Sequence, residues 1–235
     1  MKTAGVVGCS AGWFYVTLDE GSEHFERVEG DTGLKEIADR FDRIFLAIPT
    51  GLEESSAERE CDRLLRELLG DNGKEIVISP PIRTVLHAPT FAEANFEFLE
   101  ATGETLSPKT WSIVPKVKFV DKLLGGSNGM ADKVYESHPE LIYFKLNGGR
   151  IFQSKLIRKG LRHRLELLKN RKLVIADFFR DAKEEYRRNE VEETEILDAA
   201  ALAWAATRSL ESPLQWLPEE PDEDHRGVKK GICFV

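Results

Sequence analysis

The sequence predicts an α/β protein in which a mixed five-stranded sheet carries helices on both faces. Three short β-patterned segments, 4–8, 13–18 and 24–28, are joined by short turns, which is typical of an antiparallel meander. A nearly continuous apolar run over 43–48 ends at Pro49-Thr50-Gly51 and indicates a buried parallel strand. A long, mostly apolar helix is predicted over 194–210, close to the end of the chain.

The remaining elements follow from the same patterns. Leu34, Ile37, Ala38 and Phe41 share one helical face, which predicts a helix between the meander and the parallel strand. Further helices are expected from Ser55 or Ser56 to Leu69, over 89–102, 115–124, 161–172 and 177–188, and from near Pro139. Strands are expected over 75–78, 132–137 and 231–235.

This order of elements favours a ribonuclease-H-like fold, in which three antiparallel strands precede two parallel ones and the last helix packs on the sheet. A doubly wound nucleotide-binding fold would begin β-α-β and carry G-x-G-x-x-G after its first strand, and the sequence has neither. We expect a single domain over 1–235. A mainly helical insertion is expected at about 79–130, and an acidic, Pro-rich extension at about 213–235.

Composition limits the function classes. The 235 residues include 33 Lys+Arg and 41 Asp+Glu, a net charge of −8, which argues against nucleic-acid binding through overall charge but allows a local basic patch. Three Cys form no metal or disulfide spacing and suit a reducing compartment. No stretch approaches the ~18 apolar residues of a membrane helix. We therefore expect a cytoplasmic protein without a membrane partner.

Asp198 is the first candidate for chemistry. It is the only charged residue in the apolar stretch 196–206, so burial requires a cation, hydrogen-bond donors or solvent access. Glu195 lies three residues earlier on the same helical face, and two such carboxylates would share a divalent metal. Equally, both would interact with the free N–H groups and dipole of the first helical turn.

Glu136 and His138 form the second candidate. Strand alternation places Val134 and Glu136 on one face, and Glu136 at a strand end is suited to ligate a metal or orient water. His138 would be an acid/base group or a ligand. The following Ser137-His138-Pro139-Glu140 reads as a capping box, which explains Ser137, Pro139 and Glu140 without function.

A basic run is the third candidate. Residues 158–172 hold seven Lys/Arg and one acid, Glu166. Such an edge on an acidic protein would bind phosphates, although a solvated helix with snorkelling side chains is the commoner case. The candidate substrate-binding cations are Arg83, Lys116, Arg158, Arg162 and Lys169.

Short motifs spread over nearly the whole chain carry a resemblance. They include Gly5-Val6-Val7-Gly8-Cys9, Ile48-Pro49-Thr50-Gly51-Leu52, Ser79-Pro80-Pro81-Ile82-Arg83, Glu136-Ser137-His138-Pro139-Glu140 and Leu197-Asp198-Ala199. In these motifs the chain resembles the predicted-nuclease family known as domain of unknown function 429, which is assigned a ribonuclease-H-like fold. The resemblance implies a nuclease chemistry that is itself inferred from the fold.

Two positions depart from the pattern of that family. Val7 stands where the family usually has Asp in the first strand, and Ala47 where it has Asp after the buried strand. The resemblance implies that strand carboxylates and one on the last helix hold Mg²⁺ or Mn²⁺, which activates water. Asp198 and Glu136 remain as candidate metal ligands, so we expect weak Mg²⁺ or Mn²⁺ binding and no organic cofactor.

Two functions follow from these expectations. The leading hypothesis is a Mg²⁺- or Mn²⁺-dependent phosphodiester hydrolase of nuclease ancestry with an altered or degenerate metal site. Its catalytic residues would be Glu136, Asp198, Glu195 and His138. The alternative is a catalytically inactive relative that binds nucleic acid or a protein.

Overall fold

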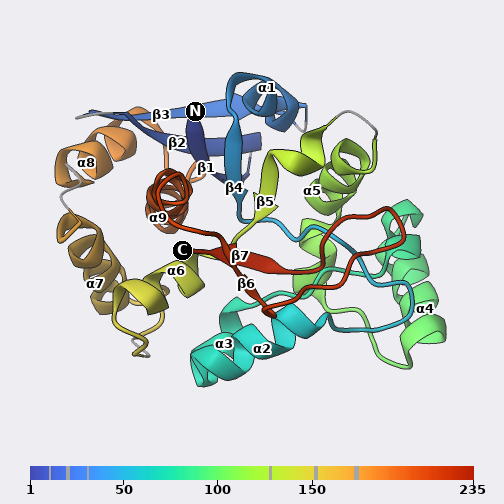
Figure 1. Ribbon diagram of the computed structural model, residues 1–235. Helices are drawn as coiled ribbons and strands as arrows, with labels where there is room; N and C mark the ends of the chain where they lie inside the picture. Colours follow the sequence, from blue (N-terminus) through green and yellow to red (C-terminus); the bar gives the residue numbers. More distant parts are fainter. Residues whose placement is uncertain (11, 20–21, 31, 127–128, 151–152, 172–174) are drawn as a thin grey trace. The chain divides into compact units, whose positions relative to one another are not determined.

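The structure is a computed structural model that describes residues 1–10, 12–19, 22–30, 32–126, 129–150, 153–171 and 175–235 (Figure 1). Its strands are β1 (Thr3–Cys9), β2 (Gly12–Asp19), β3 (Ser22–Glu29), β4 (Arg43–Leu46), β5 (Val134–Glu136), β6 (Gln215–Leu217) and β7 (Ile232–Phe234). Its α-helices are α1 (Gly33–Arg40), α2 (Glu60–Leu69), α3 (Asp71–Ile76), α4 (Phe91–Thr102), α5 (Pro108–Leu124), α6 (Pro139–Leu146), α7 (Arg158–Lys169), α8 (Ile175–Glu185) and α9 (Glu193–Arg208). Two short 3₁₀ turns cover Arg83–His87 and Met130–Asp132.

A mixed five-stranded sheet confirms the predicted fold class. The strand order is β3-β2-β1-β4-β5, with β1–β2 and β2–β3 antiparallel and β1–β4 and β4–β5 parallel. This is the meander followed by two parallel strands that the sequence predicts, and it is consistent with a ribonuclease-H-like fold. The apolar run of β4 is parallel and almost fully buried, as predicted.

The two faces of the sheet carry different helices, as Figure 1 shows for α1 and α9. Strand alternation separates Val6 and its partner Tyr15 from Gly5 and its partner Val16. The ring of Tyr15 packs on Phe41, at the end of α1, so α1 covers the Val6 face. Gly5 lies against α9, which covers the opposite face.

Close approach between β1 and α9 depends on Gly5. A Cβ at Gly5 would lie 2.1 Å from the backbone nitrogen of Ala203, and 2.3 Å from the carbonyl oxygen of Ala199. The Thr3 and Thr207 hydroxyls are 2.8 Å apart, and the Ser10 hydroxyl donates to the Asn189 carbonyl at 2.6 Å. Because low-numbered residues of β1 meet high-numbered residues of α9, the strand and the helix run antiparallel.

The chain divides into two compact units. Unit 1 comprises Met1–Ala47, Asp132–Gln215 and Cys233–Val235 and contains the five-stranded sheet. Unit 2 comprises Ile48–Ala131 and Trp216–Ile232 and contains α2 to α5. The second unit therefore holds the predicted helical insertion and most of the predicted acidic extension.

Two local predictions are wrong. The strand expected over 75–78 is replaced by helix α3, whose Gly73 packs tightly on the Arg66 backbone. The capping box over 137–140 does not form: His138 is the N-cap of α6, and its Nδ1 accepts from the Glu140 N–H at 3.2 Å. The helix expected over 161–172 begins earlier, at Arg158, and residue 172 lies outside the described residues.

Within the described parts of the chain, no helix combines the length and the apolar character needed to cross a membrane.

Candidate functional site

The N-terminus of α9 explains the position of Glu195. Glu192 is the N-cap, and its side chain accepts a hydrogen bond from the backbone of Glu195 in a capping box. In return, the Glu192 N–H donates to Glu195 Oε2 at 2.7 Å. Burial, with a smaller contribution from the nearby Glu192 and Asp198 charges, raises the pKa of Glu195 to about 7. Glu195 therefore has a local structural role beside the predicted catalytic one.

Asp198 lies one turn further along α9 and is paired with a lysine. Lys155 Nζ is 2.5 Å from Asp198 Oδ2, and the two side chains are only 20% and 9% exposed. The other oxygen, Oδ1, is buried and has no hydrogen-bond partner among the described residues. Burial lowers the pKa of Lys155, but the Asp198 and Glu140 charges outweigh it and raise that pKa above its ordinary value. Lys155 is therefore stabilised in its charged form beside Asp198.

A buried arginine holds the turn that carries Lys155. Arg164, on α7, donates from Nε and Nη2 to both oxygens of Glu140 at 2.9 and 2.5 Å. Its Nη1 donates to the Gln153 carbonyl at 3.0 Å and to the Gly160 carbonyl at 2.9 Å. A bidentate guanidinium fixes geometry as well as charge. Arg164 and Glu140 thus tie the 153–155 backbone to α6 and α7.

Tyr143 completes this polar cluster. Its hydroxyl donates to the Leu197 carbonyl at 2.7 Å, and its ring lies under the Arg164 guanidinium, 5.6 Å from the centroid. Burial, reinforced by the Asp198 and Glu140 charges, raises the pKa of Tyr143 well above its ordinary value. Tyr143 remains a neutral donor that links α6 to α9.

Glu136 and Asp198 belong to different faces of the sheet. Glu136 pairs with Leu46 and Leu46 with Val6, so Glu136 shares the Val6 face. Asp198 is on α9, which covers the Gly5 face. The two acids that the sequence suggests as ligands of one metal ion therefore do not share a face of the sheet. Two residues anchor the chain after β5. His138 is the N-cap of α6, and Ser137 donates to the Cys233 carbonyl at 2.8 Å.

The described side chains on the α9 face of the sheet do not provide the oxygen ligands of the metal centre that the fold implies. Val7 lies on β1 and Ala47 directly follows the neighbouring parallel strand β4, with the Ala47 N–H donating to the Val6 carbonyl at 2.9 Å, but their side chains offer no oxygen. Asp198 has one oxygen on an ammonium group. No group of three or more His, Cys, Asp or Glu in the described ranges is arranged to hold a metal ion. Mg²⁺ and Mn²⁺ prefer several oxygen ligands.

The basic run forms an exposed cationic face on α7. Arg158, Lys159 and Arg162 are exposed, and none has an ion pair among the described residues. Lys169 is also exposed, 3.4 Å from Glu166. The buried face of this helix instead contains Gly160, Arg164, Leu167 and Leu168, so Arg164 does not contribute to the exposed run.

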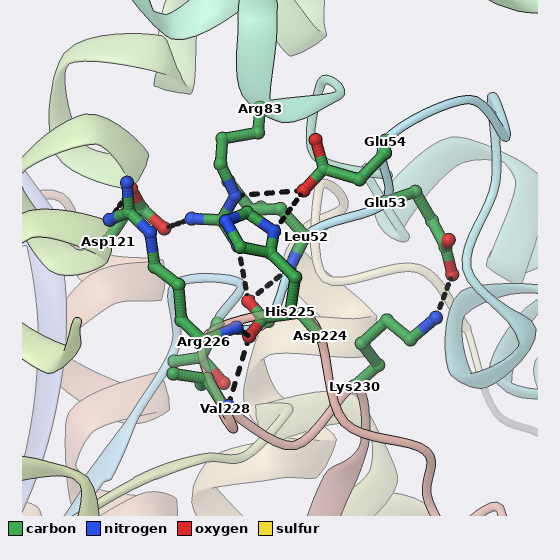
Figure 2. Close-up of polar contacts among 12 residues, drawn as sticks. Leu52, Glu53, Glu54, Arg83, Asp121, Asp224, His225, Arg226, Val228 and Lys230 are labelled. Atoms are coloured by element: carbon green, nitrogen blue, oxygen red, sulfur yellow. Dashed lines mark hydrogen bonds and ion pairs between the residues drawn. The ribbon is translucent and has the colours of Figure 1, made fainter.

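Arg83, in unit 2, is surrounded by carboxylates (Figure 2). Its Nε donates to Glu54 at 3.0 Å, and its Nη1 and Nη2 contact Asp121 and Asp224. Burial lowers the pKa of Arg83, but these carboxylates outweigh it and raise that pKa. Substrate binding by Arg83 stays a prediction, as it does for Lys116, which is half-buried on α5.

Asp224 anchors the C-terminal segment in the same network. It accepts from the N–H groups of Arg226 and Val228 at 2.8 and 3.0 Å, and from that of Leu52 at 3.2 Å. Burial raises the pKa of Asp224, but these hydrogen bonds and the Arg83 charge more than offset it and lower that pKa. His225 and Arg226 extend the network to Glu54 and Asp121 at 2.6 and 2.9 Å (Figure 2).

Sequence reasoning did not identify Lys155, Glu140 or Arg164 as part of the site. Lys155 lies in an irregular turn, and nothing in its neighbours marks it. Arg164 has a detectable signal, because it precedes Leu168 by one helical turn and so shares its buried face.

Comparison with known proteins gives one result that covers most of the chain. No curated protein and no solved structure matches the chain. The model of the family described as protein of unknown function (DUF429) matches residues 5–223. The chain therefore belongs to the DUF429 family.

Proposed function

We propose that this protein binds the phosphate backbone of nucleic acid through the exposed face of α7 and does not cleave it. The observation that carries the proposal is the set of exposed cations Arg158, Lys159 and Arg162, which have no ion pair among the described residues. Arg158 and Arg162 are one turn, or about 6 Å, apart. Unpaired surface cations release the counterions of a bound phosphate backbone, which favours association.

The lack of cleavage is argued from the α9 face of the sheet. Val7 and Ala47 cannot ligate a metal, and Asp198 is neutralised by Lys155. A nuclease of this fold needs oxygen ligands on the strands and the last helix together. The net charge of −8 opposes binding at long range, so we expect modest affinity.

Binding is tested by fluorescence anisotropy with labelled single-stranded RNA, single-stranded DNA and duplex RNA. Salt is varied from about 50 to 200 mM, where phosphate contacts produce a steep loss of affinity. The variant Arg158→Glu/Arg162→Glu should abolish measurable binding. A matched control, Lys118→Glu/Lys122→Glu, changes the net charge equally on exposed positions of α5 and should retain most of the affinity. Equal loss in both variants would overturn the assignment to α7.

One observation favours the hydrolase as a second candidate function. Asp198 Oδ1 is buried without a hydrogen-bond partner among the described residues, as an oxygen that awaits a cation would be. The same nucleic acids incubated with wild-type protein and Mn²⁺ decide this point. Specific cleavage that Asp198→Asn removes would favour the hydrolase and defeat the non-cleaving proposal.

A further inference from the structure

The region around Asp198 contains a charge arrangement that neither nucleic-acid binding nor the family explains. The Asp198 carboxylate on α9 is almost fully buried. Its Oδ2 contacts the Lys155 ammonium, and its Oδ1 has no hydrogen-bond partner among the described residues. A buried charge is costly unless it is paired and hydrogen-bonded. Lys155 therefore leaves one oxygen of the Asp198 carboxylate without a partner among the described residues.

The antiparallel course of β1 and α9 places Val7 level with this carboxylate. Gly5 lies against Ala199 and Ala203. Val7 is two residues further along the strand than Gly5, a distance of about 6.6 Å. Because α9 runs antiparallel to β1, the same distance corresponds to about four residues back toward the start of the helix. Val7 therefore lies beside the first turns of α9, to which Asp198 belongs. Ala47 directly follows β4, which is parallel to β1, and its N–H donates to the Val6 carbonyl, so Ala47 lies at the same end of the sheet as Val7.

We propose that the Lys155 ammonium occupies the place of a divalent cation beside Asp198. In this proposal Val7 and Ala47 stand where metal-binding carboxylates would be, and Lys155 supplies the positive charge that the metal ion would supply. Val7 and Ala47 offer no carboxylate, and the Lys155 ammonium balances Asp198, which has the remaining carboxylate among these three positions. The site is then neutral without a metal. It is a latent site for an oxygen-preferring divalent cation, which Lys155 excludes.

The structure around Lys155 is built to hold it there. A Cβ at Gly160 would lie 2.0 Å from the Ser154 carbonyl oxygen, so only glycine lets the turn pack on α7. Arg164 bonds the Gln153 carbonyl while Glu140 fixes Arg164 through two hydrogen bonds. Glu140 and Arg164 are thus positioning residues for Lys155. A surface lysine in chance contact would need no such anchoring.

The test measures Mn²⁺ binding by electron paramagnetic resonance in four proteins and uses no nucleic acid, so its failure is separate from failure of the proposed function. The proteins are wild type, Lys155→Met, Val7→Asp/Ala47→Asp, and the triple variant that combines these changes. The triple variant should bind Mn²⁺ at least about tenfold more tightly than Val7→Asp/Ala47→Asp, because a neighbouring ammonium repels the ion even at the effective dielectric of a protein. Equal affinity in those two proteins, or no gain over wild type in the triple variant, would overturn the proposal.

A second comparison keeps the test decisive if the added acids prevent folding. Lys155→Met retains much of the side-chain length without the charge, and Mn²⁺ should raise its melting temperature. Lys155→Met/Asp198→Asn should lose that response, and the exposed-site control Lys122→Met should behave as wild type. If Mn²⁺ does not stabilise folded Lys155→Met, the ion has no place beside Asp198 and the inference is wrong.

Discussion

At the scale of single residues, the acids of α9 show how one helical turn creates two different environments. Asp198 has a cation partner, Lys155, whose Nζ lies 2.5 Å from its Oδ2. Glu195, one turn earlier, accepts a backbone hydrogen bond and has no ion pair among the described residues. Positive charge therefore offsets the burial of the Glu195 carboxylate less than it offsets the burial of Asp198, and burial favours the protonated form of Glu195.

Glu195 should make the stability of the protein fall as pH rises through neutrality. Burial raises its pKa from 4.5 to about 7, so the folded state binds the proton more tightly than the unfolded state. Its contribution to the free energy of unfolding is fully present below about pH 4.5 and is lost as pH rises through about 7. Glu195→Gln cannot ionise but keeps an oxygen that accepts the Glu192 N–H. Urea unfolding should show it equal to wild type near pH 4.5 and more stable at pH 8.

The control for this prediction is Glu195→Ala, which removes both the charge and the hydrogen bond to the N-cap. It should gain less than Glu195→Gln at pH 8 and be less stable than wild type near pH 4.5. A difference between Glu195→Gln and wild type that is constant across this pH range would contradict the raised pKa.

At the scale of elements, the sequence predicts the helices and strands that have a local hydrophobic pattern. It does not predict the segments whose structure depends on tertiary contacts. The meander, β4 and α9 were found because alternation and apolar runs report burial directly. The strand expected over 75–78 was wrong because Gly73 lets a helix pack on the Arg66 backbone, a contact that no periodicity encodes. Likewise, the capping-box pattern predicts a helix cap at Ser137, but the hydroxyl of this residue donates to the Cys233 carbonyl, 96 residues away in the chain.

The contact between β1 and α9 should be intolerant of any side chain at Gly5. In Gly5→Ala the new Cβ would lie 2.1 Å from a backbone nitrogen, so the helix and strand must separate. Overpacking of a well-packed core typically costs about 1–3 kcal/mol, and a backbone clash falls at the upper end. Chemical denaturation should show a loss of about 3 kcal/mol.

Gly148→Ala provides a comparison for that measurement. Gly148 has a φ of +67° and open space around its Cβ position, so alanine there meets no atom. Its cost should be limited to the left-handed backbone, about 1–2 kcal/mol. Comparable losses in the two variants would show that β1 and α9 are not in rigid contact.

At the scale of the whole molecule, each unit contains a buried ionic network that joins distant parts of the chain. In unit 1, Lys155 and Asp198 are 43 residues apart, and Arg164 and Glu140 are 24 apart. In unit 2, Arg83 and Asp224 are 141 residues apart. The sequence indicates Arg83, Glu136 and Asp198 as candidate site residues, but ion pairing over such separations has no local signature. Candidate residues were therefore predictable, whereas their ion partners required the fold.

The network of unit 2 leads to the last prediction, which concerns how the two units unfold. Asp224→Asn removes the charge that Arg83 contacts and places an amide among three backbone N–H donors. Breaking a buried pair by changing one partner typically costs about 3–5 kcal/mol. Because the folded pKa of Asp224 is lowered, this contribution is present at neutral pH and is lost as pH falls through that folded pKa.

Hydrogen exchange at pH 7 should therefore accelerate over residues 48–131 and 216–232, with little change in the β-sheet of unit 1. Asp222→Asn, an exposed change in the same segment, should leave exchange unaltered. Equal acceleration in both units after Asp224→Asn would mean that they unfold as one cooperative body.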